Sequence, residues 1–202
     1  MNYGIAGDQD VQEHSKTDSR ATLELSALAG LETGVIGGAA MLLFLFAHSI
    51  LRGQFWWGYA NLLGSVAYGS SALWRGLGRA TLAGIALQLL LSGLLGVLFG
   101  VCFARTRGRA LSLLLGLSSG AIWFLVVYWI VFRRIGPLIP VYSSRPATLL
   151  GHMILGLVLS RTSTLLMEWQ SGTRLRREEP RPVALSGIQD AGQVSGTSEI
   201  VP

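Results

Sequence analysis

The sequence predicts an all-α integral membrane protein, a bundle of four transmembrane helices with disordered polar termini. Half of the residues are hydrophobic and only 13% are charged, whereas a soluble domain carries roughly 25% charged residues. The apolar residues also gather in four long blocks, each near the length of about 20 residues that crosses a bilayer. The predicted helices are 27–51, 80–104, 110–132 and 146–167, within a transmembrane domain of residues 26–168.

The chain before the first helix is polar and has no hydrophobic periodicity. Residues 1–25 are therefore predicted to form a disordered tail. Their acidic character is the reverse of the basic start of a cleavable signal peptide. The first helix then ends before Arg52.

Between the first and second helices lies an uncharged stretch, 55–74, that is diluted by Gly, Ser and Asn. Its residues Trp56, Trp57 and Tyr59 resemble the aromatic belt found at membrane–water interfaces. We favour an interfacial or partly re-entrant segment here, with a fifth crossing or an external loop as alternatives. Non-helical backbone at membrane depth would require cover from other protein or a watery cavity.

The remaining helices are bounded by arginine and proline. Gln88 is the one strongly polar side chain of helix 80–104, and Arg133 closes helix 110–132. Helix 146–167 begins at Pro146, a residue typical of a first helical turn. Residues 169–202 are basic and then polar, which predicts a disordered tail whose start can contact anionic lipid heads.

The net charge of +5 does not indicate nucleic acid, because the basic residues lie at the edges of apolar blocks. Positive charge at such edges sets membrane topology. Four crossings put both termini on one side, with nine basic residues near helix ends there against six on the other side. The positive-inside rule therefore favours cytoplasmic termini. Lys16 is the one lysine among 16 basic residues, a bias that indicates a bacterial source and hence the bacterial plasma membrane.

Each predicted helix contains a row of small residues spaced four apart, which we call a small-residue row. Such rows allow helix backbones to approach closely in lipid. They predict a tight bundle, and leave open whether the contacts lie within the chain or between subunits. The rows are Gly30-Gly34-Gly38, Ser92-Gly96-Gly100, Ser112-Gly116-Gly120 and Gly156-Ser160-Thr164.

Two histidines, His48 and His152, are predicted at the same depth of the membrane. If their helix faces met, the imidazoles could bind a metal ion or a haem. A metal site usually has three or four ligands, and no further ligand is expected nearby. We therefore favour hydrogen bonds to backbone or water and expect no cofactor. A proton-relay or quinone-contact role is the other alternative.

Glu32, Gln88 and Arg161 are the intramembrane polar candidates. Ionisable groups within a span are costly and are usually paired or functional. Glu32 and Arg161 could pair because the first and fourth helices run antiparallel. One helix contact cannot bury both this pair and the two histidines, so solvation, a substrate path and an intersubunit contact are the alternatives. Gln88 is expected to form an interhelical hydrogen bond.

No reaction signature is present: there is no Walker-type loop, HExxH or GxSxG motif. The single cysteine, Cys102, excludes an internal redox pair. The sequence therefore favours a non-enzymatic protein, an accessory subunit or homo-oligomer whose partners are the lipid bilayer and other membrane subunits or itself. The alternatives are an oligomeric transporter or channel lined by Glu32, Gln88 and Arg161, and a haem- or metal-binding redox protein. No motif is specific enough to name a family.

Overall fold

The computed structural model describes residues 6–106 and 108–178. Within that part of the chain all regular structure is helical. Four helical stretches are long and apolar enough to span a membrane, as predicted, and they are Arg20–Leu51, Arg79–Phe103, Arg109–Ile135 and Arg145–Ser171. The expectations for residues 1–5, Arg107 and 179–202 lie outside the described residues.

The first helix, α1 (Ala6–Leu51), begins much earlier than predicted. The prediction of a disordered tail is therefore wrong over residues 6–25. No glycine or proline occurs from Asp8 to Ala29. Because adding a residue to an existing helix is far easier than starting a new one, the helix that begins in the apolar block extends backward through this polar stretch.

The segment predicted to be interfacial or re-entrant contains the helix α2 (Gly58–Tyr68) and the 3₁₀ helix η1 (Ser70–Trp74). The eleven residues of α2 rise about 16 Å at about 1.5 Å per residue, about half of the roughly 30 Å hydrocarbon core. A fifth crossing is therefore excluded for α2. A plain loop is excluded as well, because the middle of α2 is buried.

The second stretch is α3 (Arg79–Phe103), and the third is built from three consecutive helical pieces. It starts as α4 (Arg109–Leu125), widens into a π-helical turn, η2 (Val126–Val131), and ends as α5 (Phe132–Ile135). A short helix, α6 (Ile139–Tyr142), follows in the predicted proline-containing loop. The Tyr128 hydroxyl donates to the Pro140 carbonyl at 2.9 Å and accepts from Arg145 Nε at 3.2 Å. These bonds fix the end of the third stretch to the start of the fourth.

The fourth stretch is interrupted, where the sequence predicted one helix ending at residue 167. It consists of α7 (Arg145–Leu159) and α8 (Thr162–Glu178). At the break, Ser160 Oγ donates to the Leu157 carbonyl at 2.6 Å, and Ser112 Oγ of α4 donates to the Ser160 carbonyl at 2.6 Å. Side-chain hydrogen bonds of this kind compete with the helical ones. Since α8 continues to Glu178, the predicted disorder is also wrong over residues 169–178.

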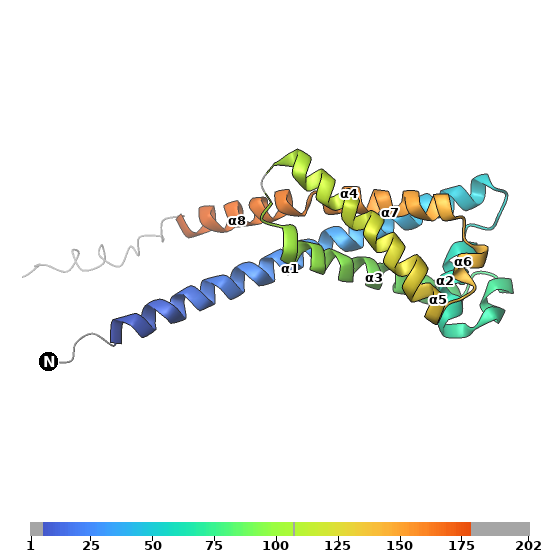
Figure 1. Ribbon diagram of the computed structural model, residues 1–202, viewed down its shortest axis with the longest axis horizontal. Coiled ribbons are helices and arrows are strands. Elements are labelled where there is room, and N and C mark those ends of the chain that lie inside the picture. The colour runs from blue at the N-terminus through green and yellow to red at the C-terminus, as the bar shows by residue number, and fades with distance from the viewer. Residues whose placement is uncertain (1–5, 107, 179–202) are drawn as a thin grey trace, which may run out of the picture. The chain divides into compact units, whose positions relative to one another are not determined.

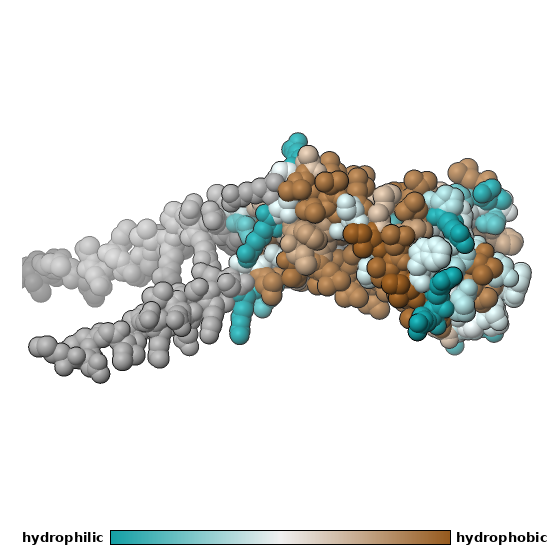
Figure 2. All heavy atoms as spheres, viewed as in Figure 1, coloured by the Kyte–Doolittle hydropathy of each residue, from teal (hydrophilic) through white to brown (hydrophobic). Residues whose placement is uncertain are grey.

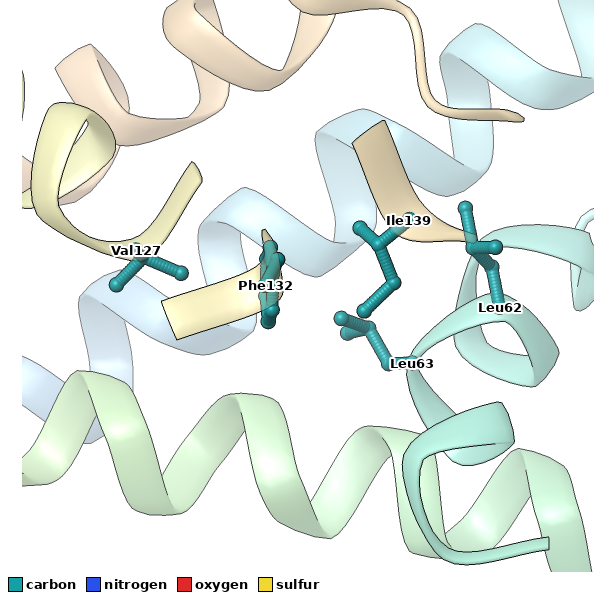
Figure 3. Close-up of a cluster of buried hydrophobic side chains, with 5 residues drawn as sticks. All are labelled: Leu62, Leu63, Val127, Phe132 and Ile139. Carbon is teal, nitrogen blue, oxygen red and sulfur yellow. The ribbon is translucent and has the colours of Figure 1, made fainter. Parts of the chain in front are cut away.

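Figure 1 shows the short helices α2, α5 and α6 gathered at one end of the bundle, which we call the loop end. A buried cluster holds them together there (Figure 3), and its members are Leu62, Leu63, Val127, Phe132 and Ile139. On the face shown in Figure 2, hydrophobic residues cover the middle of the bundle, and hydrophilic groups lie at either end of this region. The compact unit that contains these helices ends at Glu168.

Candidate functional site

The small-residue rows of α1 and α3 face each other. A Cβ atom built on Gly34 would lie 2.8 Å from Gly96 Cα, and one built on Gly30 would lie 2.9 Å from Gly100 Cα. Real Cβ atoms essentially never come this close to other atoms. The two backbones are therefore in direct contact, a geometry that only glycine permits at these positions. Gly38 meets the Ser92 side chain instead of backbone.

The rows of α4 and α7 form a second contact of the same kind. A Cβ on Gly116 would meet the Gly156 carbonyl and would lie 3.0 Å from Ser160 Cβ. One on Gly120 would meet the His152 carbonyl. The rows thus pack helices within one chain, which answers the question that the sequence left open. Bulky residues at Gly34 are accordingly expected to disturb the fold itself.

A third close contact was missed in the sequence. Gly64 of α2 faces the Ala80 carbonyl, and Gly84 of α3 faces the Ala60 carbonyl. The signal is the spacing of four between Ala60 and Gly64 and between Ala80 and Gly84. Small residues therefore line both halves of α3, which packs on α2 near its start and on α1 near its end.

A buried polar network joins α2 to the start of α3 and was also missed. Asn61 is fully buried; its Nδ2 donates to the Arg75 carbonyl at 2.7 Å, and its Oδ1 accepts from the Thr81 hydroxyl at 2.6 Å. Thr81 Oγ1 in turn accepts from the Gly78 N–H at 3.1 Å. The turn between η1 and α3 is thereby held against α2.

Gln88 lies at the α1–α3 contact, and its Nε2 donates to Met41 Sδ at 3.3 Å and to Ser92 Oγ at 3.1 Å. It is buried, whereas Glu32 and Arg161 are exposed. Within one chain these three side chains therefore do not line a common path.

The two histidines occupy different environments. His152 is buried against Phe124 of α4, and its Nδ1 lies 2.8 Å from the Thr148 carbonyl. His48 is half-buried and lines a cavity at the loop end together with Arg52. The arrangement does not support one haem or metal site shared by both imidazoles. Among the described residues, no three His, Cys, Asp or Glu side chains gather as metal ligands would.

Glu32 and Arg161 lie at one level of the bundle. The residues that follow them, Thr33 and Thr162, join α1 to α8 by a buried hydroxyl–hydroxyl hydrogen bond of 2.7 Å. The helices run antiparallel there, because Gly37 of α1 packs on Leu155, which precedes Thr162. Each charged residue precedes its threonine by one position. For Glu32, the turn of about 100° per helical residue directs the side chain to one side of the helix pair. Arg161 lies in the turn between α7 and α8 and is exposed beside the same threonine contact.

This side, which we call the Glu32/Arg161 face, points away from the rest of the bundle. The residues that come one position after the contacts lie on the opposite side of the helix pair, toward the bundle. Gly34 of α1 packs there against α3, and His152 of α7 packs against α4. The described part of the chain contains no ion pair between Glu32 and Arg161. The contact between the helices thus buries two threonines rather than either of the pairs considered from the sequence.

Comparison with known protein families, with curated proteins and with solved structures finds no match for this chain.

Proposed function

We propose that this chain is a multi-pass membrane protein without enzymatic activity that acts as a structural subunit, and that it assembles first as a homodimer. The observation that supports the proposal is the Glu32/Arg161 face. Two opposite charges are exposed there on helices that are long and apolar enough to span a membrane. Charged groups within a span usually pair with one another or face protein.

A second copy of the chain meets this requirement. Because Glu32 and Arg161 share one level, a two-fold axis along the membrane normal places Glu32 of each copy opposite the partner's Arg161. Such an interface uses the same surface on both copies, as two-fold dimers do, and forms the ion pair twice. A shallow apolar hollow of about 250 Å³ also lies over α7, lined by Leu150, Ile154 and Leu157 together with Phe44 of α1 and Leu117 of α4.

Charge reversal tests the homodimer. Chains with Glu32→Arg alone or Arg161→Glu alone are expected to lose the dimer, because each places like charges opposite each other twice. Co-expression of the two variants, each with its own affinity tag, is expected to restore it, because every reversed charge then faces an opposite one. The measurement is the fraction of differently tagged chains recovered together in lipid nanodiscs.

The controls separate three arrangements. Arg109→Glu reverses a charge near the same end on α4, and should leave the dimer intact. The double variant Glu32→Arg/Arg161→Glu carries both reversals in one chain. If this variant restores the recovered fraction of dimer and co-expression of the single variants does not, the ion pair forms within the chain. Purification of the wild type with a different protein in stoichiometric amount would replace the homodimer by an accessory subunit of a larger complex.

The orientation is proposed as well, with the termini in the bacterial cytoplasm and the loop end outside. In a Cys102→Ala background, a cysteine at Ser71 is expected to react with a membrane-impermeant maleimide in intact spheroplasts. A cysteine at Thr106 should react only after permeabilisation, because an odd number of crossings separates the two positions. The reverse labelling would invert the orientation, and equal labelling of both would contradict a four-helix topology.

A further inference from the structure

A cavity of about 1070 Å³ opens at the loop end of the bundle. Three segments that are far apart in the sequence form it: the end of α1 with the loop that follows, the α2–η1 segment, and the connection from α6 to α7. In Figure 1 these segments lie at the end of the bundle where α2, α5 and α6 gather. Its volume is at the upper end of the range for small-molecule sites.

The charge of this cavity is positive. Arg52 and Arg75 line it, and its walls contain no Asp or Glu. In the whole stretch from Thr33 to Met167, every charged residue is an arginine. Burial raises the pKa of the Tyr59 phenol, which also lines the cavity, so this group adds no negative charge. The arginines at the cavity therefore have no carboxylate of the surrounding chain to neutralise them.

One polar atom of the wall lacks a partner. Ser143 Oγ is the one buried side-chain oxygen or nitrogen among the described residues that forms no hydrogen bond, and Ser143 lines the cavity. Buried polar groups are nearly always hydrogen-bonded. This unpaired hydroxyl lies beside the cavity but is not exposed to it.

Aromatic side chains form another part of the wall. Phe55 and Trp57 stack with ring centroids 4.6 Å apart, and Trp74, with 82% of its surface exposed, lines the same cavity. Asn61 holds the Arg75 carbonyl and thereby anchors the backbone at this residue. Cationic groups beside aromatic side chains suit a ligand with an anionic head and an apolar body.

We propose that the loop-end cavity binds an anionic amphiphile, with its phosphate or carboxylate head held by Arg52 and Arg75 and its apolar part against Trp57 and Trp74. The molecule comes either from the bilayer, as an anionic phospholipid, or from solution, as a free anionic amphiphile. This inference is independent of the proposed homodimer, whose Glu32/Arg161 face lies nearer the other end of the helices.

Titration of the full-length protein in a mild neutral detergent tests the site, with tryptophan fluorescence as the signal. The probes are dioctanoyl phosphatidylglycerol, dioctanoyl phosphatidylcholine, octyl phosphate and inorganic phosphate. We expect phosphatidylglycerol or octyl phosphate to bind about tenfold or more tightly than phosphatidylcholine and inorganic phosphate, since hydrogen bonds to charged groups are the stronger ones. Tighter binding of phosphatidylglycerol than of octyl phosphate assigns the bilayer as the source, and the reverse assigns a free amphiphile.

Two variants locate the binding. Arg52→Gln/Arg75→Gln is expected to weaken it about tenfold or more, whereas the control Arg133→Gln/Arg134→Gln removes the same charge from the loop end outside the cavity and should not. An equal loss of affinity in the Arg52→Gln/Arg75→Gln and Arg133→Gln/Arg134→Gln variants would overturn the proposal. Phosphatidylcholine that binds as tightly as phosphatidylglycerol would overturn it as well.

Discussion

Replacing Gly96 by alanine is expected to destabilise the protein by about 3 kcal/mol or more, the upper part of the range for overpacked sites. The added methyl group would meet the Gly30 carbonyl and would lie 2.7 Å from Gly34 Cα. These are backbone atoms of α1, so relief requires that the two helices move apart. The midpoint and slope of unfolding in mixed detergent–SDS micelles give the change in the free energy of unfolding.

The control is the same substitution three residues away. A Cβ at Gly93 would meet only the ends of the Leu31 and Val35 side chains, at 3.0 and 3.4 Å. These ends can shift, and alanine favours a helix over glycine by about 1 kcal/mol. Gly93→Ala should therefore be neutral or slightly stabilising. Equal losses in the two variants would contradict the direct backbone contact of α1 and α3.

Asn61→Leu is expected to cost roughly 2–4 kcal/mol, since each buried group left unsatisfied costs about 1–3 kcal/mol. The substitution leaves the Arg75 carbonyl and the Thr81 hydroxyl without the amide that binds both. The same unfolding assay measures the loss. We also expect faster proteolysis between η1 and α3, because the network holds this turn against α2.

Ser65→Ala is the matched control for this network. Ser65 is buried on the same helix, but its hydroxyl donates to the Leu62 carbonyl of its own helix. Its removal should cost no more than about 1 kcal/mol, the net value of a typical hydrogen bond. A loss as large as that of Asn61→Leu would show that general packing, rather than the network, determines the effect.

The sequence predicts the four apolar helices well, because apolar block length and flanking arginines are local properties. Interactions between distant residues explain where it fails. The break at Ser160 depends on a hydroxyl of Ser112, 48 residues earlier. The early start of α1 depends on helix growth from a packed segment rather than on hydrophobic periodicity.

The candidate residues show the same contrast between local features, which the sequence reveals, and contacts between distant residues, which it does not. Spacing alone indicated that Gly34 and Gly96 pack helices, but it could not show that they pack against each other. The paired-charge hypothesis located Glu32 and Arg161 at one depth, yet missed that Thr33 and Thr162 occupy the contact between the helices. The loop-end cavity had no sequence signal, because its arginines and Ser143 come from separate segments.

Because α3 packs on both α1 and α2, the order in which the helices are synthesised affects how they assemble. The segment α2 is synthesised before α3, and is too short to cross a membrane by itself. The surface on which it packs, at Ala80 and Gly84, and the hydroxyl that Asn61 binds, on Thr81, do not exist until the ribosome has released α3. During translation α2 therefore cannot reach its final place before α3 is available, so a later segment of the chain determines where an earlier one packs.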